Sequence, residues 1–282
     1  MRKGLIDKIN YSIALLKKAQ SLALNMNENG FWLAFSGGKD SQVLYHLAKI
    51  ADVKFTAHMN PTTIDPGEVI RFVKRNYKDV IIEKPNMSIY NMVIKKHFLP
   101  TRTKRFCCKE YKEVAGVGYV TLIGIRKYES VKRSKRSELE TLNKTYSGSF
   151  DEFDINKESI VTCVGGKDKI LLSPIFNWTD RDVWEFLKAK KIQHCKLYDE
   201  GKARIGCILC PMSRKSDKMD DLKKYPYVRD KYIEAIKKCR KEGYMSKYQR
   251  SAEDVFEWWI SGISAKKYYA MKYLQYKINF KY

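Results

Sequence analysis

The sequence of 282 residues lacks any apolar run that approaches the ~20 residues of a transmembrane helix. Glycine and proline are sparse, at 15 and 7 residues, which excludes a collagen, and 44% hydrophobic residues exclude a disordered chain. The amino terminus is unlike a signal peptide, because lysines interrupt its apolar positions. We therefore expect a globular, cytoplasmic protein with no membrane partner, in which residues 1–20 form an amphipathic helix.

Acidic residues are few beside basic ones: 32 Asp and Glu stand against 55 Lys and Arg, which gives a formal net charge of +23. A positive potential of this kind attracts phosphates. The excess is typical of a protein with a polyanionic partner, and it is equally typical of a surface covered with solvated lysines. Charge alone leaves both interpretations open.

Short apolar segments alternate with segments of helical periodicity over the first half of the chain. This alternation predicts the α/β class, with a doubly wound, mostly parallel sheet that has helices on both faces. The predicted strands are 31–35, 52–59, 79–83 and 119–125, and the predicted helices are 42–50, 65–76, 87–97 and 107–115.

The pattern dissolves into a polar stretch at about 134–169, which we expect to be an insertion with one weak strand at 159–164. Periodicity then returns in a strand and a helix whose N-cap is Thr179 or Asn177. Residues 213–282 are basic, helical in pattern and rich in tyrosine. We therefore expect an α/β domain over 1–212, including the insertion and a cysteine segment, and an α-helical C-terminal extension over 213–282.

A Gly-Gly turn lies between the first predicted strand and its helix. Backbone N–H groups at a helix start can surround an anion, and glycines let the main chain approach it closely. A lysine there adds charge and serines add hydroxyls. This position favours a phosphate-binding loop over a simple turn capped by Asp40, and the loop consists of Ser36, Gly37, Gly38, Lys39, Asp40 and Ser41.

A second polar group follows the strand predicted at 119–125, at the sheet edge where ligands bind in open parallel sheets. Helical spacing would pair Glu129 with Arg133 and Arg126 with Ser130. These are either ordinary helix pairs or a fork in which the two arginines bind phosphate or sulfate and Glu129 orients one of them. The position at the sheet edge favours the fork.

Four of the seven cysteines form two close pairs, Cys107-Cys108 and Cys207-x-x-Cys210. Cysteines of an unsecreted chain stay reduced, so this spacing points to ligation or catalysis rather than to disulfides. Four thiolates suit zinc or an iron–sulfur cluster, and unliganded buried cysteines are the third alternative. Adjacent cysteines are awkward as two ligands of one small ion, which counts against zinc.

The loop sequence FSGGKDS resembles the signature of the N-type ATP pyrophosphatases and of their relatives, the sulfonucleotide (PAPS and APS) reductases. Further blocks continue the resemblance over about 31–212, namely TTIDPGEVIRFV, RFCCKEYKE, GIRKYESVKR, PIFNWTDRDVWEFL and YDEGKARIGCILCPM. The resemblance implies the adenine nucleotide alpha hydrolase-like (HUP-like) fold and an adenine nucleotide at the loop.

In the ATP-using branch, the resemblance implies attack on the α-phosphate of ATP, departure of pyrophosphate and help from Mg²⁺. It implies catalytic roles for Lys39, Asp40, Arg126 and Arg133, with Ser36 to Ser41, Glu129 and Ser130 also binding the nucleotide. In the APS-reductase branch, a Cys-Cys and a distant CxxC bind a 4Fe–4S cluster. The same role is implied here for Cys107, Cys108, Cys207 and Cys210, with zinc as the alternative.

Sulfonucleotide reductases carry a catalytic cysteine in a Cys-Gly-Leu-His element, and none follows Cys239. This departure favours an ATP pyrophosphatase that activates a nucleic acid, DNA or tRNA, for sulfur incorporation, as in DNA phosphorothioation. A cysteine desulfurase or another sulfur donor is then the expected partner. The alternatives are a sulfonucleotide reductase that takes its thiol from elsewhere and a non-catalytic subunit that binds nucleotide and nucleic acid. The sequence leaves open whether the protein forms a homodimer.

Overall fold

The computed structural model describes residues 1–141, 146–153, 169–246 and 251–279. The chain divides into two compact units, each assembled from segments that are distant in sequence. Unit 1 comprises 1–60, 67–84 and 113–205, and unit 2 comprises 61–66, 85–112 and 206–282.

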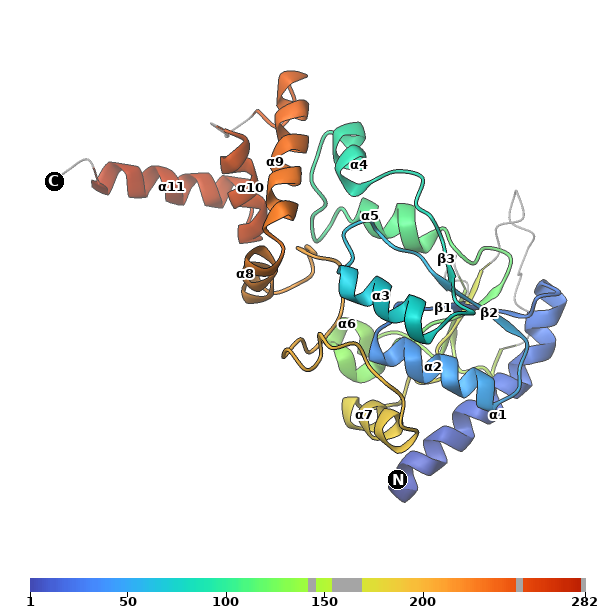
Figure 1. Ribbon diagram of the computed structural model, residues 1–282. Coiled ribbons are helices and arrows are strands. Elements are labelled where there is room, and N and C mark those ends of the chain that lie inside the picture. The colour runs from blue at the N-terminus through green and yellow to red at the C-terminus, as the bar shows by residue number, and fades with distance from the viewer. Residues whose placement is uncertain (142–145, 154–168, 247–250, 280–282) are drawn as a thin grey trace. The chain divides into compact units, whose positions relative to one another are not determined.

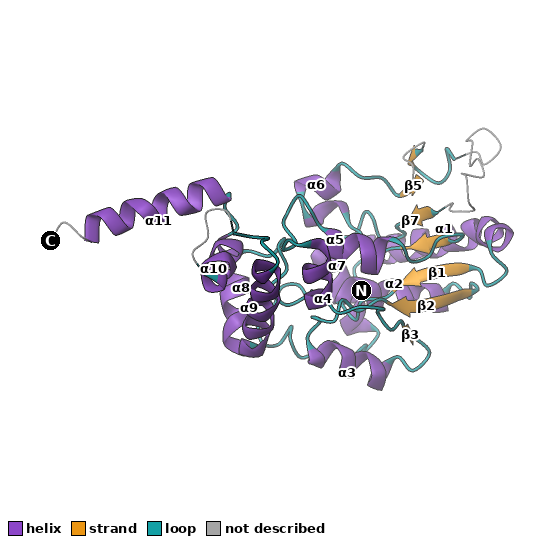
Figure 2. Cartoon of the chain, turned by 90° about the horizontal axis from the view of Figure 1, so that it is seen from above, coloured by secondary structure: helices purple, strands orange, loops and turns teal. Residues whose placement is uncertain are grey.

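Unit 1 is built on a sheet of seven strands in the order β3-β2-β1-β4-β7-β5-β6 (Figures 1 and 2). The strands from β3 to β7 in this order run parallel, whereas β5 pairs antiparallel with β7 and β6. This mostly parallel sheet confirms the predicted α/β class. The strands are β1 Phe31–Ala34, β2 Phe55–Met59, β3 Ile81–Ile82, β4 Val120–Leu122, β5 Leu139–Thr141, β6 Ser147–Gly148 and β7 Ile170–Leu172.

The helices of unit 1 bury apolar faces in its core. The predicted amino-terminal helix is confirmed as α1, which turns Leu5, Leu16 and Ala23 inward, and α2 packs against both α1 and α7. In the described residues, no helix is long and apolar enough to cross a bilayer. The elements are α1 Lys3–Met26, α2 Lys39–Ile50, α3 Gly67–Asn76, the short 3-10 helix η2 Lys127–Glu129, α6 Val131–Ser134 and α7 Asp180–Ala189.

Unit 2 is helical and has its own core, in which Tyr232 and Trp259 are buried. Its central helix α9 contacts α4, α8 and α10. The C-terminal helices are present as predicted. Unlike Tyr232 and Trp259, Tyr227 and Tyr273 on these helices are exposed. The helices are α4 Ile89–Lys96, α5 Phe106–Cys108, α8 Lys215–Lys224, α9 Pro226–Lys241, α10 Ala252–Ser261 and α11 Ala265–Asn279.

The units differ from the division expected at 212/213, because both cysteine segments belong to unit 2 with the C-terminal helices. The described part of the expected insertion supplies two short strands, β5 and β6, that extend the sheet beyond β7. Three-residue antiparallel strands carry too little periodicity to be recognised in sequence. The weak strand expected at 159–164 lies outside the described residues. The helix expected at 107–115 is instead α5 followed by a π-helical turn, η1 Lys109–Glu113.

The strand order changes direction at β1. The chain proceeds from β1 to β2 and β3 on one side, and β4 then lies on the other side of β1. The loops that leave the carboxyl ends of β1 and β4 therefore diverge, which is the arrangement that opens a ligand crevice in α/β sheets. Residues 35–38 and 123–126 are these two loops.

Candidate functional site

The loop after β1 has a backbone that only glycine fits. Gly37 has a φ of +71°, and a Cβ there would lie 2.8 and 2.9 Å from side-chain carbons of Val73 and Val69. Ser41 Oγ donates to the carbonyl of Gly38 across 2.9 Å and accepts the N–H of Ser36 across 3.2 Å. The serines thus fold the loop onto the start of α2, where backbone N–H groups point outward.

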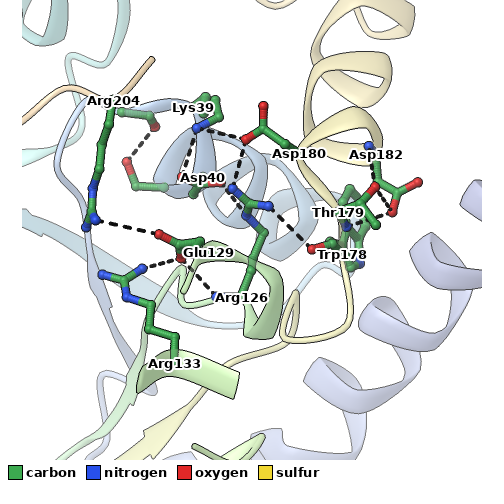
Figure 3. A network of polar contacts seen from close by, with 12 residues as sticks. Lys39, Asp40, Arg126, Glu129, Arg133, Trp178, Thr179, Asp180, Asp182 and Arg204 are labelled. Atoms are coloured by element: carbon green, nitrogen blue, oxygen red, sulfur yellow. Dashed lines mark hydrogen bonds and ion pairs between the residues drawn. The ribbon is translucent and has the colours of Figure 1, made fainter. Parts of the chain in front are cut away.

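Two cations and two carboxylates alternate beside this loop (Figure 3). The side chain of Lys39 is only 4% exposed, and its Nζ lies 3.1 Å from Asp180 Oδ1 and 3.6 Å from Asp40 Oδ2. Arg126, 3% exposed, donates from Nε to Asp40 across 2.7 Å and from Nη2 to Asp180 across 3.0 Å. The structure therefore brings Lys39, Asp40 and Arg126 together and adds Asp180, the first residue of α7.

The loop after β4 packs closely against the first turn of α2. A Cβ on Gly124 would lie 3.2 Å from the carbonyl carbon of Asp40, so the glycine after β4 lets the first turn of α2 come close. Arg126 follows two residues later and also reaches the Trp178 carbonyl with Nη1 at 3.4 Å. Such multiple contacts fix a guanidinium in one orientation.

A second cationic group surrounds Glu129 (Figure 3). Arg133 forms an ion pair with the Glu129 carboxylate, and Arg204 Nη1 lies 3.9 Å from the same carboxylate. Burial lowers the pKa of Arg133, Arg204 lowers it further, and Glu129 opposes the shift. Two arginines sharing one carboxylate leave a net positive charge, which favours an anion.

Residues 126–133 do not form the single helix that would give all of them helical spacing. A 3-10 helix ends at Glu129, Ser130 is extended, and α6 begins at Val131. The pair of Glu129 with Arg133 exists all the same, whereas the Ser130 hydroxyl accepts the N–H of Arg133 and caps α6. Ser130 thus supports the arginine block through the backbone.

The four paired cysteines all belong to unit 2, and three of them raise the pKa of the fourth, Cys107. A hydrogen bond with Cys108 raises the pKa of Cys107, and burial and the nearby Cys207 and Cys210 raise it further. Burial likewise raises the pKa of Cys207, to about 11, although Lys112 opposes the shift. Among the described residues, however, no three His, Cys, Asp or Glu side chains are placed as ligands of one metal ion.

The remaining cysteines are separate from this group. Cys195 is buried in the core of unit 1, and Cys239 donates to the Val93 carbonyl at 3.7 Å in unit 2. Cys163 lies outside the described residues. Sequence reasoning missed two residues at the loop, namely Asp180, whose carboxylate pairs with Lys39, and Tyr198, whose Oη accepts the N–H of Lys39. Both lie in the resembling blocks, but neither belongs to a motif with an assigned chemistry.

A mostly parallel sheet with a glycine-rich loop after β1, at the point where strand order reverses, is the arrangement in which open α/β sheets bind nucleotides. Residues 30–213 match the phosphoadenosine phosphosulfate reductase domain, and the chain belongs to this family.

The chain is also similar to two other proteins and to one solved structure. The chain is 27% identical over 254 residues to an uncharacterized protein of Methanocaldococcus jannaschii, covering 84% of this chain and 54% of that one. It is 28% identical over 202 residues to the adenosine 5′-phosphosulfate reductase of Oceanobacillus iheyensis, covering 66% and 73%. The PAPS reductase of Candida auris superimposes with a TM-score of 0.44 at 17% identity, covering 73% and 96%. The chain spans about half the length of the two Methanocaldococcus relatives that it matches.

Proposed function

We propose that this protein is an ATP pyrophosphatase that forms AMP and pyrophosphate and so activates a nucleic acid for sulfur incorporation, as in DNA phosphorothioation. One observation carries the choice of ATP: the carboxylates of Asp40 and Asp180 both approach Lys39 Nζ at the loop. Mg²⁺ is held in proteins by one or two carboxylates together with substrate phosphates.

Asp40 and Asp180 fit Mg²⁺ by donor chemistry, since both are carboxylates and Asp180 is 61% exposed. When bound with the nucleotide, Mg²⁺ supplies neutralisation of phosphate charge. In its absence Lys39 and Arg126 neutralise the same two carboxylates. The nucleotide phosphates would compete with them for the two cations.

The chain's own residues account for the leaving group. An acceptor oxygen attacks the α-phosphorus, the bond to the bridging oxygen of the β-phosphate breaks, and that oxygen leaves with its electron pair as pyrophosphate. Lys39 and the backbone N–H groups at the start of α2 stabilise the charge that develops there. Arg126 and Arg133 hold the α-phosphate side, with Glu129 orienting Arg133.

The four paired cysteines are proposed to hold a 4Fe–4S cluster, with zinc as the alternative. Donor chemistry supports this assignment, because Cys108, Cys207 and Cys210 lie close enough to Cys107 to raise its pKa. In addition, Lys112 Nζ lies 3.8 Å from Cys207 Sγ. A cation there offsets the charge of thiolates. The cluster would join α5 to the segment around 207–210.

A nucleic acid acceptor and a separate sulfur donor belong to the same proposal. Support comes from the net charge of +23 and from exposed aromatic rings beside lysines in unit 2. Lys231 Nζ, for example, lies 5.9 Å from the ring centroid of the exposed Tyr227. Such pairs combine phosphate contacts with base stacking in proteins that bind single strands.

The second candidate is a sulfonucleotide reductase, favoured by the name of the Oceanobacillus relative. The same loop and arginines would then bind the phosphosulfate end of APS or PAPS. The reaction needs a thiol that attacks the sulfate sulfur, and no Cys-Gly-Leu-His element occurs in the 282 residues.

Purified protein mixed with Mg²⁺ and ATP labelled at separate phosphates distinguishes these reactions. The proposal requires AMP and pyrophosphate, stimulated by nucleic acid. ADP and phosphate contradict it, and sulfite formed from APS or PAPS with added thiol establishes the reductase instead. Nucleic acid binding with steep salt dependence, but no turnover of any nucleotide, indicates a non-catalytic subunit.

A further inference from the structure

Tyr198 lies at the phosphate loop although no motif assigns it a role. It follows α7 in the chain, and its Oη accepts the backbone N–H of Lys39, the first residue of α2, across 2.8 Å. A Cβ on Gly38 would lie 3.4 Å from the same oxygen. The hydroxyl therefore lies against the loop where a bound anion is expected.

The Tyr198 ring is held in place. The rings of Trp184 and Tyr198 pack in a T-shaped arrangement with centroids 5.0 Å apart, and the Tyr198 N–H donates to the Cys195 carbonyl across 3.0 Å. Lys39 Nζ lies 5.8 Å from the ring centroid. A hydroxyl fixed by packing can meet a ligand with little loss of side-chain entropy.

The Tyr198 hydroxyl has a hydrogen to give. As an acceptor it is satisfied by Lys39, but no described residue accepts from it. Burial, together with the nearby Asp40 and Asp180 carboxylates, raises the pKa of Tyr198, so the hydroxyl keeps its proton at neutral pH. The backbone N–H of Lys39 opposes this shift only in part.

We propose that Tyr198 binds the ligand beside the loop. Its Oη accepts the N–H of Lys39, and its hydroxyl hydrogen is donated to an oxygen of the phosphoanhydride end of the nucleotide. Tyr198 thereby extends the donor set of the loop from backbone and Lys39 to a neutral hydroxyl. The inference rests on the proposed function for the identity of ATP, but it requires only that an anionic group bind at residues 36–41. In the alternative, the Tyr198 hydroxyl only accepts the N–H of Lys39 at the start of α2 and does not contact the ligand.

The test compares dissociation constants of ATP, inorganic pyrophosphate and AMP for wild type and Tyr198→Phe, by calorimetry. A hydrogen bond to a charged acceptor predicts affinities about tenfold or more weaker for ATP and pyrophosphate. The affinity for AMP should stay within about twofold of wild type, because the proposed function assigns its phosphate to the arginines. Unchanged constants for ATP and pyrophosphate overturn the inference. Equal losses for all three ligands also overturn it, because they indicate a structural cap.

Tyr45→Phe is the matched control, since Tyr45 lies on α2 and its hydroxyl donates to Asp79, away from the loop. It should lower the unfolding temperature and leave all three constants unchanged. If wild-type protein binds APS but not ATP, the proposed ATP reaction fails, and the comparison of APS with AMP still decides for or against Tyr198. If wild type binds none of these ligands, both proposals are overturned.

Discussion

Arg126 donates from Nε to Asp40 Oδ1 across 2.7 Å, although 86 positions separate the two residues in the chain. The contact ties the loop after β4 to the first turn of α2, across the point where strand order reverses. Asp40 lies in the first turn of α2, whose N-cap, Gly38, has no side-chain cap, and its carboxylate pairs with Arg126 instead. It is the partner that fixes the direction of the buried guanidinium.

Replacing Arg126 should damage both stability and binding. Arg126→Ala leaves Asp40 without its ion-pair partner, and we expect the free energy of unfolding to fall by about 2–3 kcal/mol. The loss comes mainly from the buried pair of Arg126 with Asp40, because the pair with the exposed Asp180 is screened by solvent. Urea unfolding measures this loss. Arg126→Lys keeps the charge but loses the second donor, so it should retain more stability than Arg126→Ala. Equal stability of Arg126→Ala and wild type would contradict the structural role of the contact.

Replacing Lys39 tests the leaving-group assignment. Lys39→Ala should reduce formation of AMP and pyrophosphate by roughly a hundredfold or more, as expected when ~3 kcal/mol of charge stabilisation is removed from a preorganised site. The initial rate with labelled ATP measures it. Lys49→Ala is the control, because Lys49 pairs with Asp79 at the other end of the same helix. A similar loss in both variants would assign the effect to α2 rather than to the site.

Metal content tests the cysteine assignment. Protein purified without oxygen should be brown and contain roughly four iron and four sulfide per chain, and Ser in place of Cys107, Cys108, Cys207 or Cys210 should remove the colour. Cys239→Ser should keep it, since that buried thiol donates to a backbone carbonyl instead. Elemental analysis that finds one zinc and no iron would establish the alternative.

Asp182 makes folding stability depend on acid pH. Burial alone would raise its pKa, but hydrogen bonds from Lys8 and Thr179 outweigh burial and lower the pKa from 3.8 to about 2. A carboxyl whose folded pKa is depressed stabilises the fold above its unfolded pKa and loses this effect as pH falls through the folded value. We expect about 2 kcal/mol at neutral pH and about half of that at pH 3.

The measurement for Asp182 is urea unfolding of wild type and Asp182→Asn at both pH values. The variant should be less stable than wild type at neutral pH, and the difference should shrink at pH 3. Lys8 Nζ lies 2.6 Å from Asp182, so the pair ties α1 to α7. A difference that is the same at both pH values would show that the charge of Asp182 does not contribute.

Patterns within short segments were sufficient for much of this protein. The alternation of strands and helices predicted the α/β class, and a Gly-Gly turn between β1 and α2 marked the loop that the structure shows. These features depend on neighbours in sequence, such as the φ of +71° that Gly37 adopts. The family blocks were likewise visible without coordinates, as the match over 30–213 agrees.

Contacts between distant segments were decided only by the tertiary structure. Asp180 and Tyr198 reach the loop because the chain returns to it through β7 and α7, and no local pattern encodes that approach. The membership of both cysteine segments in unit 2, and the two strands β5 and β6, depend in the same way on packing across the chain. Local propensity determines the elements, whereas burial and charge pairing between elements determine which side chains meet.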